Sequence, residues 1–161
     1  MEYRRLYEIG KDNLINTDIA DAVLDARLLL EFICHTDRNY LYAHGDEDVS
    51  PFLEEMYLQA IKKRAEHIPL QHITGRQEFM GLDFIVNEHV LIPRQDTETL
   101  VEEAMLCCND GDSLLDLCTG SGCVLISVAR YKNDLRTVGV DISEEAIEVA
   151  RKNADRLLEG D

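Results

Sequence analysis

The stretch that decides the fold of this chain is LLDLCTGSGCVLISVA, residues Leu114–Ala129. It runs from buried-type aliphatic residues through Asp116 into a loop with two glycines, and then back into aliphatic residues. Glycine at the point where a strand turns into a helix lets the backbone approach a ligand without a Cβ in the way. The helix N-terminus that follows offers free N–H groups and positive dipole character, which favour a carboxylate or a phosphate.

The elements around this loop predict a parallel β-α-β unit followed by one more helix. Residues 113–117 and 137–141 read as short strands, and residues 122–131 read as the helix between them. Ser143 is placed to cap the final helix, which reads SEEAIEVARKNADRLL. Because parallel sheets are normally buried on both faces, two strands form only the beginning of such a sheet.

The residues before the unit predict a helical start and then a hairpin. Residues 1–73 read as a small helical bundle, with Ser50 and Pro51 at the N-cap and first positions of one of its helices. Residues 74–95 read as a linker that contains a β-hairpin. Residues 96–161 then form the start of a Rossmann-like domain, so the predicted fold class is α/β.

Composition restricts the classes of partner. The chain has 161 residues, of which 45% are hydrophobic, and no apolar run is long enough to span a membrane. Its five cysteines form no CxxC pair and predict reduced thiols in a cytoplasmic protein with no metal site. The net charge of -16 disfavours nucleic acid as a direct partner and fits a basic protein better.

A second acid narrows the class of ligand. Asp141 ends the second predicted strand. An acid at that place commonly accepts hydrogen bonds from both hydroxyls of a ribose. A dinucleotide requires G-x-G-x-x-G, but the string from Gly120 is G-S-G-C-V-L, and Leu125 occupies the third glycine position. An NAD-dependent dehydrogenase is therefore the weakest interpretation.

S-adenosylmethionine is the alternative ligand, because methyltransferases of the Rossmann-like class carry an acid followed by G-x-G-x-G. The corresponding string in this chain is Asp116-Leu117-Cys118-Thr119-Gly120-Ser121-Gly122. Two of the three glycines are present, and Cys118 takes the place of the first. A negative φ at Cys118 would tolerate this small side chain, whereas a positive φ would weaken the assignment of this cofactor.

Three strings in this order resemble a known family. They are PLQHITGRQEFMGLDFIVNEHVLIPRQDTETLVE (residues 69–102), LLDLCTGSGC (residues 114–123) and VGVDISEEAIEVARKNA (residues 138–154). Together they resemble the HemK/PrmC family, which methylates the side-chain nitrogen of the glutamine in the GGQ motif of bacterial peptide chain release factors. The string IPRQDTE before the loop is the most distinctive of these features.

The resemblance implies roles for particular residues. Asp116 and residues 118–122 would line the S-adenosylmethionine pocket, with Asp116 at the ligand's amino group, and Asp141 would accept the ribose hydroxyls. Close to the active-site entrance the resemblance places Arg94, Thr97 and Glu98. The helical bundle would recognise the release factor, and the complete protein is expected to be a cytoplasmic monomer.

One departure from the family bears on activity. The N-P-P-Y signature that grips the glutamine amide does not occur in these 161 residues. We therefore expect no catalytic residue in this chain, and we expect an N-terminal piece of a longer protein that is inactive alone. Two alternatives stay open: an adenine N6-type nucleic-acid methyltransferase, and a non-enzymatic helical protein-interaction module.

Overall fold

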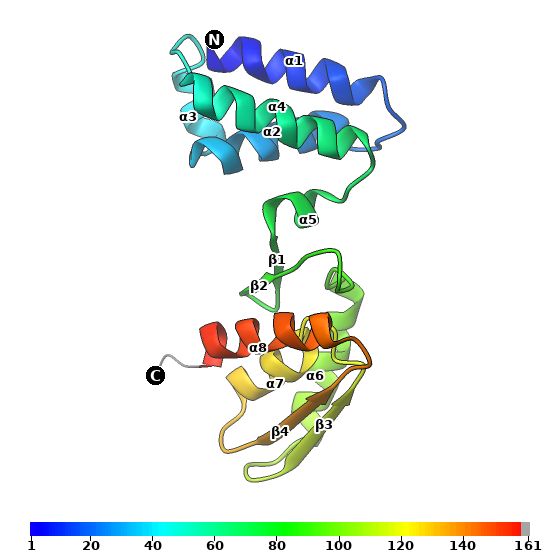
Figure 1. Ribbon diagram of the computed structural model, residues 1–161. Helices are drawn as coiled ribbons and strands as arrows, with labels where there is room; N and C mark the ends of the chain where they lie inside the picture. Colours follow the sequence, from blue (N-terminus) through cyan, green and yellow to red (C-terminus); the bar gives the residue numbers. More distant parts are fainter. Residues whose placement is uncertain (159–161) are drawn as a thin grey trace. The chain divides into compact units, whose positions relative to one another are not determined.

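The structure, a computed structural model, describes residues 1–158 (Figure 1). The chain divides into two compact units, Met1–Thr74 and Gly75–Asp161. In the described residues the first unit is helical apart from an isolated bridge between Glu2 and Asp48, and the second contains all the named strands. None of the helices in residues 1–158 combines the length and the apolar character that crossing a membrane requires.

The first unit is a bundle whose helices share one core. Its elements are α1 (Tyr3–Ile15), α2 (Ala22–Cys34), α3 (Arg38–Ala43), α4 (Pro51–Ala65) and α5 (Leu70–Thr74). The core is made by fully buried side chains from α1, α2 and α4: Leu6, Leu14, Leu29, Leu30 and Tyr57. The sequence-predicted start of α4 is confirmed, because Pro51 is its first residue and the Ser50 hydroxyl accepts a hydrogen bond from the N–H of Leu53.

Close packing of α1 on α4 depends on a glycine. A Cβ added at Gly10 would lie 1.9 Å from the hydroxyl oxygen of Tyr57. That hydroxyl is buried and donates a hydrogen bond to the carbonyl of Ala26 at 3.1 Å, so it joins α4 to α2. Asp25 and Arg64 add a largely buried ion pair at 2.7 Å between the same two helices.

The second unit opens with the predicted hairpin. Strands β1 (Arg76–Phe79) and β2 (Leu82–Ile85) pair antiparallel. Met80 and Gly81 form the two-residue turn, with φ values of 52° and 71°. Positive φ at both central residues is the signature of a type I′ turn, whose twist matches that of the flanking strands. A short 3₁₀ helix η1 (Gln95–Thr97) follows and leads into α6 (Glu98–Cys107).

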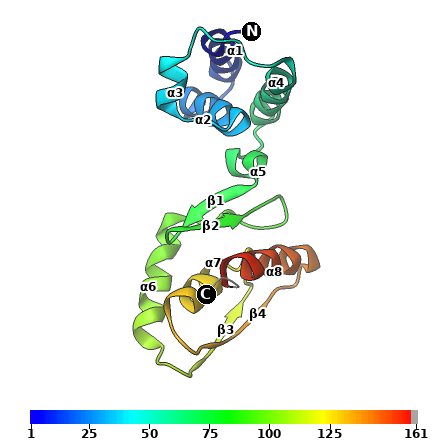
Figure 2. The ribbon, with the colours of Figure 1, turned by 90° about the vertical axis from the view of Figure 1, so that its left-hand side faces the viewer.

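The rest of the unit is the predicted strand-helix-strand-helix arrangement, in the order β3 (Ser113–Leu117), α7 (Cys123–Tyr131), β4 (Arg136–Val140) and α8 (Glu144–Leu158). The two strands are parallel, with Asp116 opposite Gly139. Figures 1 and 2 show α7 and α8 along the same face of this strand pair. The other face is exposed in the described residues, so the sheet presents apolar side chains to solvent: Leu115, Leu117, Val138 and Val140.

Candidate functional site

The loop between β3 and α7 has left-handed backbone at alternate positions. Cys118, Gly120 and Gly122 have φ values of 63°, 55° and 79°. The φ of Cys118 is therefore positive: the loop holds this residue in the backbone conformation that favours glycine, where a Cβ crowds its own backbone. The positive φ weakens the support that Cys118 gives to the assignment of S-adenosylmethionine as the cofactor.

The two glycines of the loop serve different purposes. A Cβ on Gly122 would lie 2.7 Å from Ile126 and 3.3 Å from Ala150, so this glycine allows α7 and α8 to approach the loop. A Cβ on Gly120 would meet no atom within 4 Å. Among residues 1–158, the backbone at Gly120 thus faces open space with no side chain filling it, which fits the close approach of a ligand.

Two acids from the ends of neighbouring strands meet this loop. The carboxylate of Asp141 accepts hydrogen bonds from the N–H of Gly120 at 2.9 Å and the N–H of Ser143 at 3.1 Å. Asp116, at the end of β3, accepts a hydrogen bond from the hydroxyl of Thr119 at 2.8 Å. The strand order brings both acids to one edge of the sheet, since the carboxyl ends of parallel strands meet there.

The electrostatic surroundings of Asp141 suit a carboxylate that accepts hydrogen bonds from hydroxyl groups. The backbone N–H of Ser143, and then that of Gly120, hold the pKa of the Asp141 carboxyl below its ordinary value. The group is therefore ionised at neutral pH. Each of its oxygens accepts one backbone bond and keeps capacity for another, and the side chain is only partly buried.

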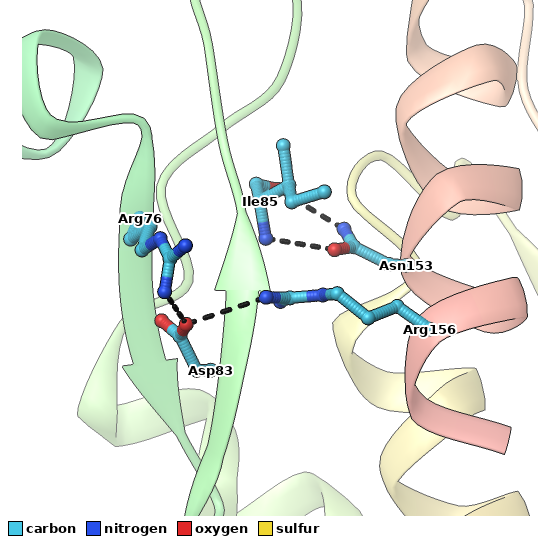
Figure 3. A network of polar contacts seen from close by, with 5 residues as sticks. All are labelled: Arg76, Asp83, Ile85, Asn153 and Arg156. Atoms are coloured by element: carbon cyan, nitrogen blue, oxygen red, sulfur yellow. Dashed lines mark hydrogen bonds and ion pairs between the residues drawn. The ribbon is translucent and has the colours of Figure 1, made fainter. Parts of the chain in front are cut away.

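Asn153 is a residue that the sequence prediction missed, and Figure 3 shows its place between α8 and β2. Its side-chain oxygen accepts from the N–H of Ile85 at 2.7 Å, and its NH₂ group donates to the carbonyls of Ile85 at 3.0 Å and Ser121 at 2.9 Å. The residue is completely buried. It therefore fixes the hairpin and the glycine loop to the same helix.

A signal for Asn153 did exist in the sequence. The buried face of α8 consists of Ala146, Val149 and Asn153 at helical spacing, so the asparagine interrupts an apolar stripe. A polar side chain at such a position requires hydrogen-bond partners from another element. The pattern does not indicate which element supplies them.

Two family models match the chain, a PrmC N-terminal domain over residues 6–75 and a methyltransferase domain over residues 108–158. The chain is 43% identical over 136 residues to the release factor glutamine methyltransferase of Moorella thermoacetica, covering 83% of this chain and 48% of that protein. The protein of the same name from Geobacter sulfurreducens is 37% identical over 153 residues, covering 95% and 54%. The chain belongs to the HemK/PrmC family of release factor glutamine methyltransferases.

The chain spans about half the length of these curated relatives. The chain is also 33% identical over 177 residues to a bifunctional methyltransferase of Rickettsia conorii. The match covers 94% of this chain but only 34% of that longer protein. The family match confirms the predicted helical start and the methyltransferase β-α-β-α region that follows it.

The three residues that the HemK/PrmC resemblance placed near the active-site entrance have distinct surroundings. Glu98 accepts a hydrogen bond from the N–H of Met80 at 2.8 Å, while the hydroxyl of Tyr131 donates to the carbonyl of Met80 at 2.6 Å. Glu98 thus helps to hold the hairpin turn. Arg94 is exposed and Thr97 is half-buried, and within residues 1–158 no hydrogen bond or ion pair joins either side chain to the glycine loop. Their proximity to a substrate stays a prediction.

Proposed function

We propose that this chain supplies the cofactor-binding part of a release factor glutamine methyltransferase and that its cofactor is S-adenosylmethionine. The observation that carries the proposal is the hydrogen bond from the N–H of Gly120 to Asp141, beside the open space at Gly120. This arrangement presents an ionised carboxylate next to bare backbone, as a ribose-bearing ligand requires. The names of the relatives supply the substrate, a peptide chain release factor.

Particular residues would hold the cofactor. Residues 118–122 would border its methionine portion, Asp141 would accept the two ribose hydroxyls, and Asp116 would lie at the amino group. The bound cofactor supplies an electrophilic methyl group on a sulfonium. Because Asp141 is already fixed by two backbone N–H groups, it needs no rearrangement to accept the sugar.

The chemistry at the acceptor needs groups that this sequence does not contain. An amide nitrogen is a poor nucleophile, since its lone pair is delocalised into the carbonyl. An enzyme must hold that nitrogen in line with the methyl group and accept its hydrogens at well-placed oxygens. The N-P-P-Y signature that does so in the family is absent from these 161 residues. We propose that the chain binds the cofactor and that methyl transfer needs the signature.

Titration calorimetry with S-adenosylmethionine tests the proposal. The 161-residue chain should bind the cofactor, and Asp141→Ala should abolish the heat of binding. Asp155 is exposed on α8, and within residues 1–158 it makes no hydrogen bond or ion pair with the loop, so Asp155→Ala is the matched control and should bind as the unchanged chain does. A correctly folded chain that shows no heat of binding would refute the cofactor-binding role.

Incubation with labelled cofactor and candidate substrates tests the acceptor. A full-length relative carrying N-P-P-Y should label the glutamine of a release factor, whereas this chain alone should not. Labelling of adenine in RNA or DNA in place of the release factor would favour the nucleic-acid methyltransferase. Efficient labelling of a release factor by the chain alone would show that the signature is not needed.

A further inference from the structure

The helical unit carries a groove that the methyl-transfer site does not use. Three tyrosines and three arginines from α1, α2 and α3 line it: Tyr3, Tyr7, Tyr42, Arg4, Arg27 and Arg38. Its deeper part has a volume of about 280 Å³, and a second hollow of about 550 Å³ shares Tyr7, Arg27, Arg38 and Tyr42 with it. We call the two together the tyrosine–arginine groove.

The groove concentrates positive charge in an acidic part of the chain. Residues 1–74 contain 8 lysines and arginines against 14 aspartates and glutamates. Three of these eight cations line the deeper part of the groove, which contains one acid, Glu8, and that carboxylate is paired with Lys11. The second hollow is lined by a further acid, Asp21, so three arginines and two acids line the groove as a whole, whereas acids outnumber cations in the unit.

One of the arginines is free to meet a ligand. Arg27 is paired with Glu31 at 2.6 Å, and Arg4 is paired with Asp46 at 2.8 Å. Arg38 is exposed and makes no ion pair within the part of the chain that the structure describes. Its guanidinium lies 5.4 Å from the centre of the Tyr42 ring, which holds it over the groove by a cation–π contact.

The second hollow adds exposed apolar surface beside these cations. Tyr42 is 71% exposed, and Ile15 and Val23 are 53% and 51% exposed. Continuous apolar patches of this kind mark interaction sites. Tyrosine and arginine are also among the residues that contribute most to binding energy when an interface covers them.

We propose that the tyrosine–arginine groove binds an acidic polypeptide segment, independently of methyl transfer. A carboxylate of the segment pairs with Arg38, and its apolar side chains cover Tyr42, Val23 and Ile15. A nucleic acid fits less well, because a continuous phosphate chain is repelled by the net negative charge of the unit. A short acidic segment interacts chiefly with the nearest cations, since salt screens charges more than about 10 Å away.

Fluorescence anisotropy tests this proposal with a panel of labelled peptides in which glutamate alternates with leucine, phenylalanine or tyrosine. The 161-residue chain should bind at least one of them, and the affinity should fall when salt is added. Arg38→Glu should weaken that binding at least tenfold, or about 1.4 kcal/mol, because it places a like charge at the contact. The same peptide with glutamine in place of glutamate should bind at least tenfold more weakly.

The matched control lies on the same bundle. Arg5 is exposed on α1 and lies two residues from both Tyr3 and Tyr7, so it points away from the groove, and Arg5→Glu changes the net charge by the same amount. Arg5→Glu should bind the peptide as the unchanged chain does. Circular dichroism and the melting temperature establish that both variants fold.

Several results would overturn the proposal. Failure of every acidic peptide to bind would exclude the groove as a site for such segments. Equal weakening by Arg5→Glu and Arg38→Glu would show that only net charge matters. Tighter binding of a labelled single-stranded RNA than of any peptide would identify the groove as a nucleic-acid surface. Tyr42→Ala should also weaken peptide binding, and an unchanged affinity would contradict the apolar contact.

Discussion

At the scale of the residue, Cys118 is held in a conformation that disfavours it. Its φ of 63° lies in the left-handed region, which costs a residue with a Cβ about 1–2 kcal/mol. Cys118→Gly should therefore raise the free energy of unfolding by about 1 kcal/mol, measured by urea denaturation, after allowance for the greater entropy of unfolded glycine. Cys118→Ala removes the thiol but keeps the Cβ and should give no gain. Equal stability of the two variants would show that the backbone there is unstrained.

The pKa of Asp141 predicts a dependence of stability on pH. Its folded pKa lies below the ordinary value of 3.8, because the N–H groups of Ser143 and Gly120 donate to the ionised form. The stabilisation is therefore present above that ordinary value and is lost as the pH falls through the lowered one. Asp141→Asn should lower the melting temperature at neutral pH, and the difference from the unchanged chain should shrink in acid.

A control on the same unit separates this effect from general acid unfolding. Asp155 is exposed on α8, and Asp155→Asn should leave the melting temperature unchanged at neutral and at acid pH. A difference between the unchanged chain and Asp141→Asn that is the same at every pH would mean that the titration of Asp141 does not affect folding.

How far residues were predictable depended on whether their role is local. The meeting of Asp116 and Asp141 at the loop followed from strand order alone, because parallel strands end at one edge. The φ of Cys118 did not follow from its side chain, because the closing of the loop into α7 sets it. Residue preference predicts a backbone conformation only where the surrounding chain leaves it free.

At the scale of the element, the same distinction explains which helix ends were predicted correctly. Ser143 caps α8 as expected, since its hydroxyl accepts from the N–H of Ala146 at 3.0 Å. By residue type, Thr17 or Asp18 could cap the next helix, but the hydroxyl of Thr17 donates to the carbonyl of Leu14 and closes α1, and α2 begins only at Ala22. A threonine between two helices can satisfy either end, and the sequence alone does not decide between them.

Asn153 gives the sharpest prediction at this scale. Asn153→Ala would leave the N–H and carbonyl of Ile85 and the carbonyl of Ser121 without partners. We expect a loss of about 2–4 kcal/mol in the free energy of unfolding of the second unit. Hydrogen exchange should increase in β2 and in the glycine loop, because both depend on this side chain.

Two further variants test the role of the Asn153 amide. Asn153→Asp keeps the size but places a carboxylate against two carbonyl oxygens, so at neutral pH it should destabilise at least as much as alanine does, and less once acid protonates it. Lys152→Ala, at an exposed neighbour, should change neither stability nor exchange. Faster exchange in α8 alone, with β2 unaffected, would contradict the link to the hairpin.

At the scale of the whole molecule, the chain consists of a helical unit and a strand-containing unit whose cores are separate. Periodicity and turn signals predicted the helical bundle, the hairpin and the strand-helix-strand-helix unit, because those signals are local, but they did not predict the short helix α5. The tyrosine–arginine groove was not predicted, since its residues come from three helices. A surface that several elements share is determined by packing, which a single sequence does not reveal.

The exposed face of the β3–β4 pair predicts how this chain behaves in solution. Leu115, Leu117 and Val138 are 58%, 67% and 57% exposed and lie together on one face, whereas parallel sheets are normally covered on both. The 161-residue chain should therefore self-associate as its concentration rises, and sedimentation velocity should detect this. Val138→Lys should weaken the association about tenfold, since it replaces buried apolar area by a charge. Leu106→Lys makes the same change of charge on α6, where Leu106 is 80% exposed, and should leave association unchanged. If the unchanged chain sediments as a monomer at every concentration, this face does not associate.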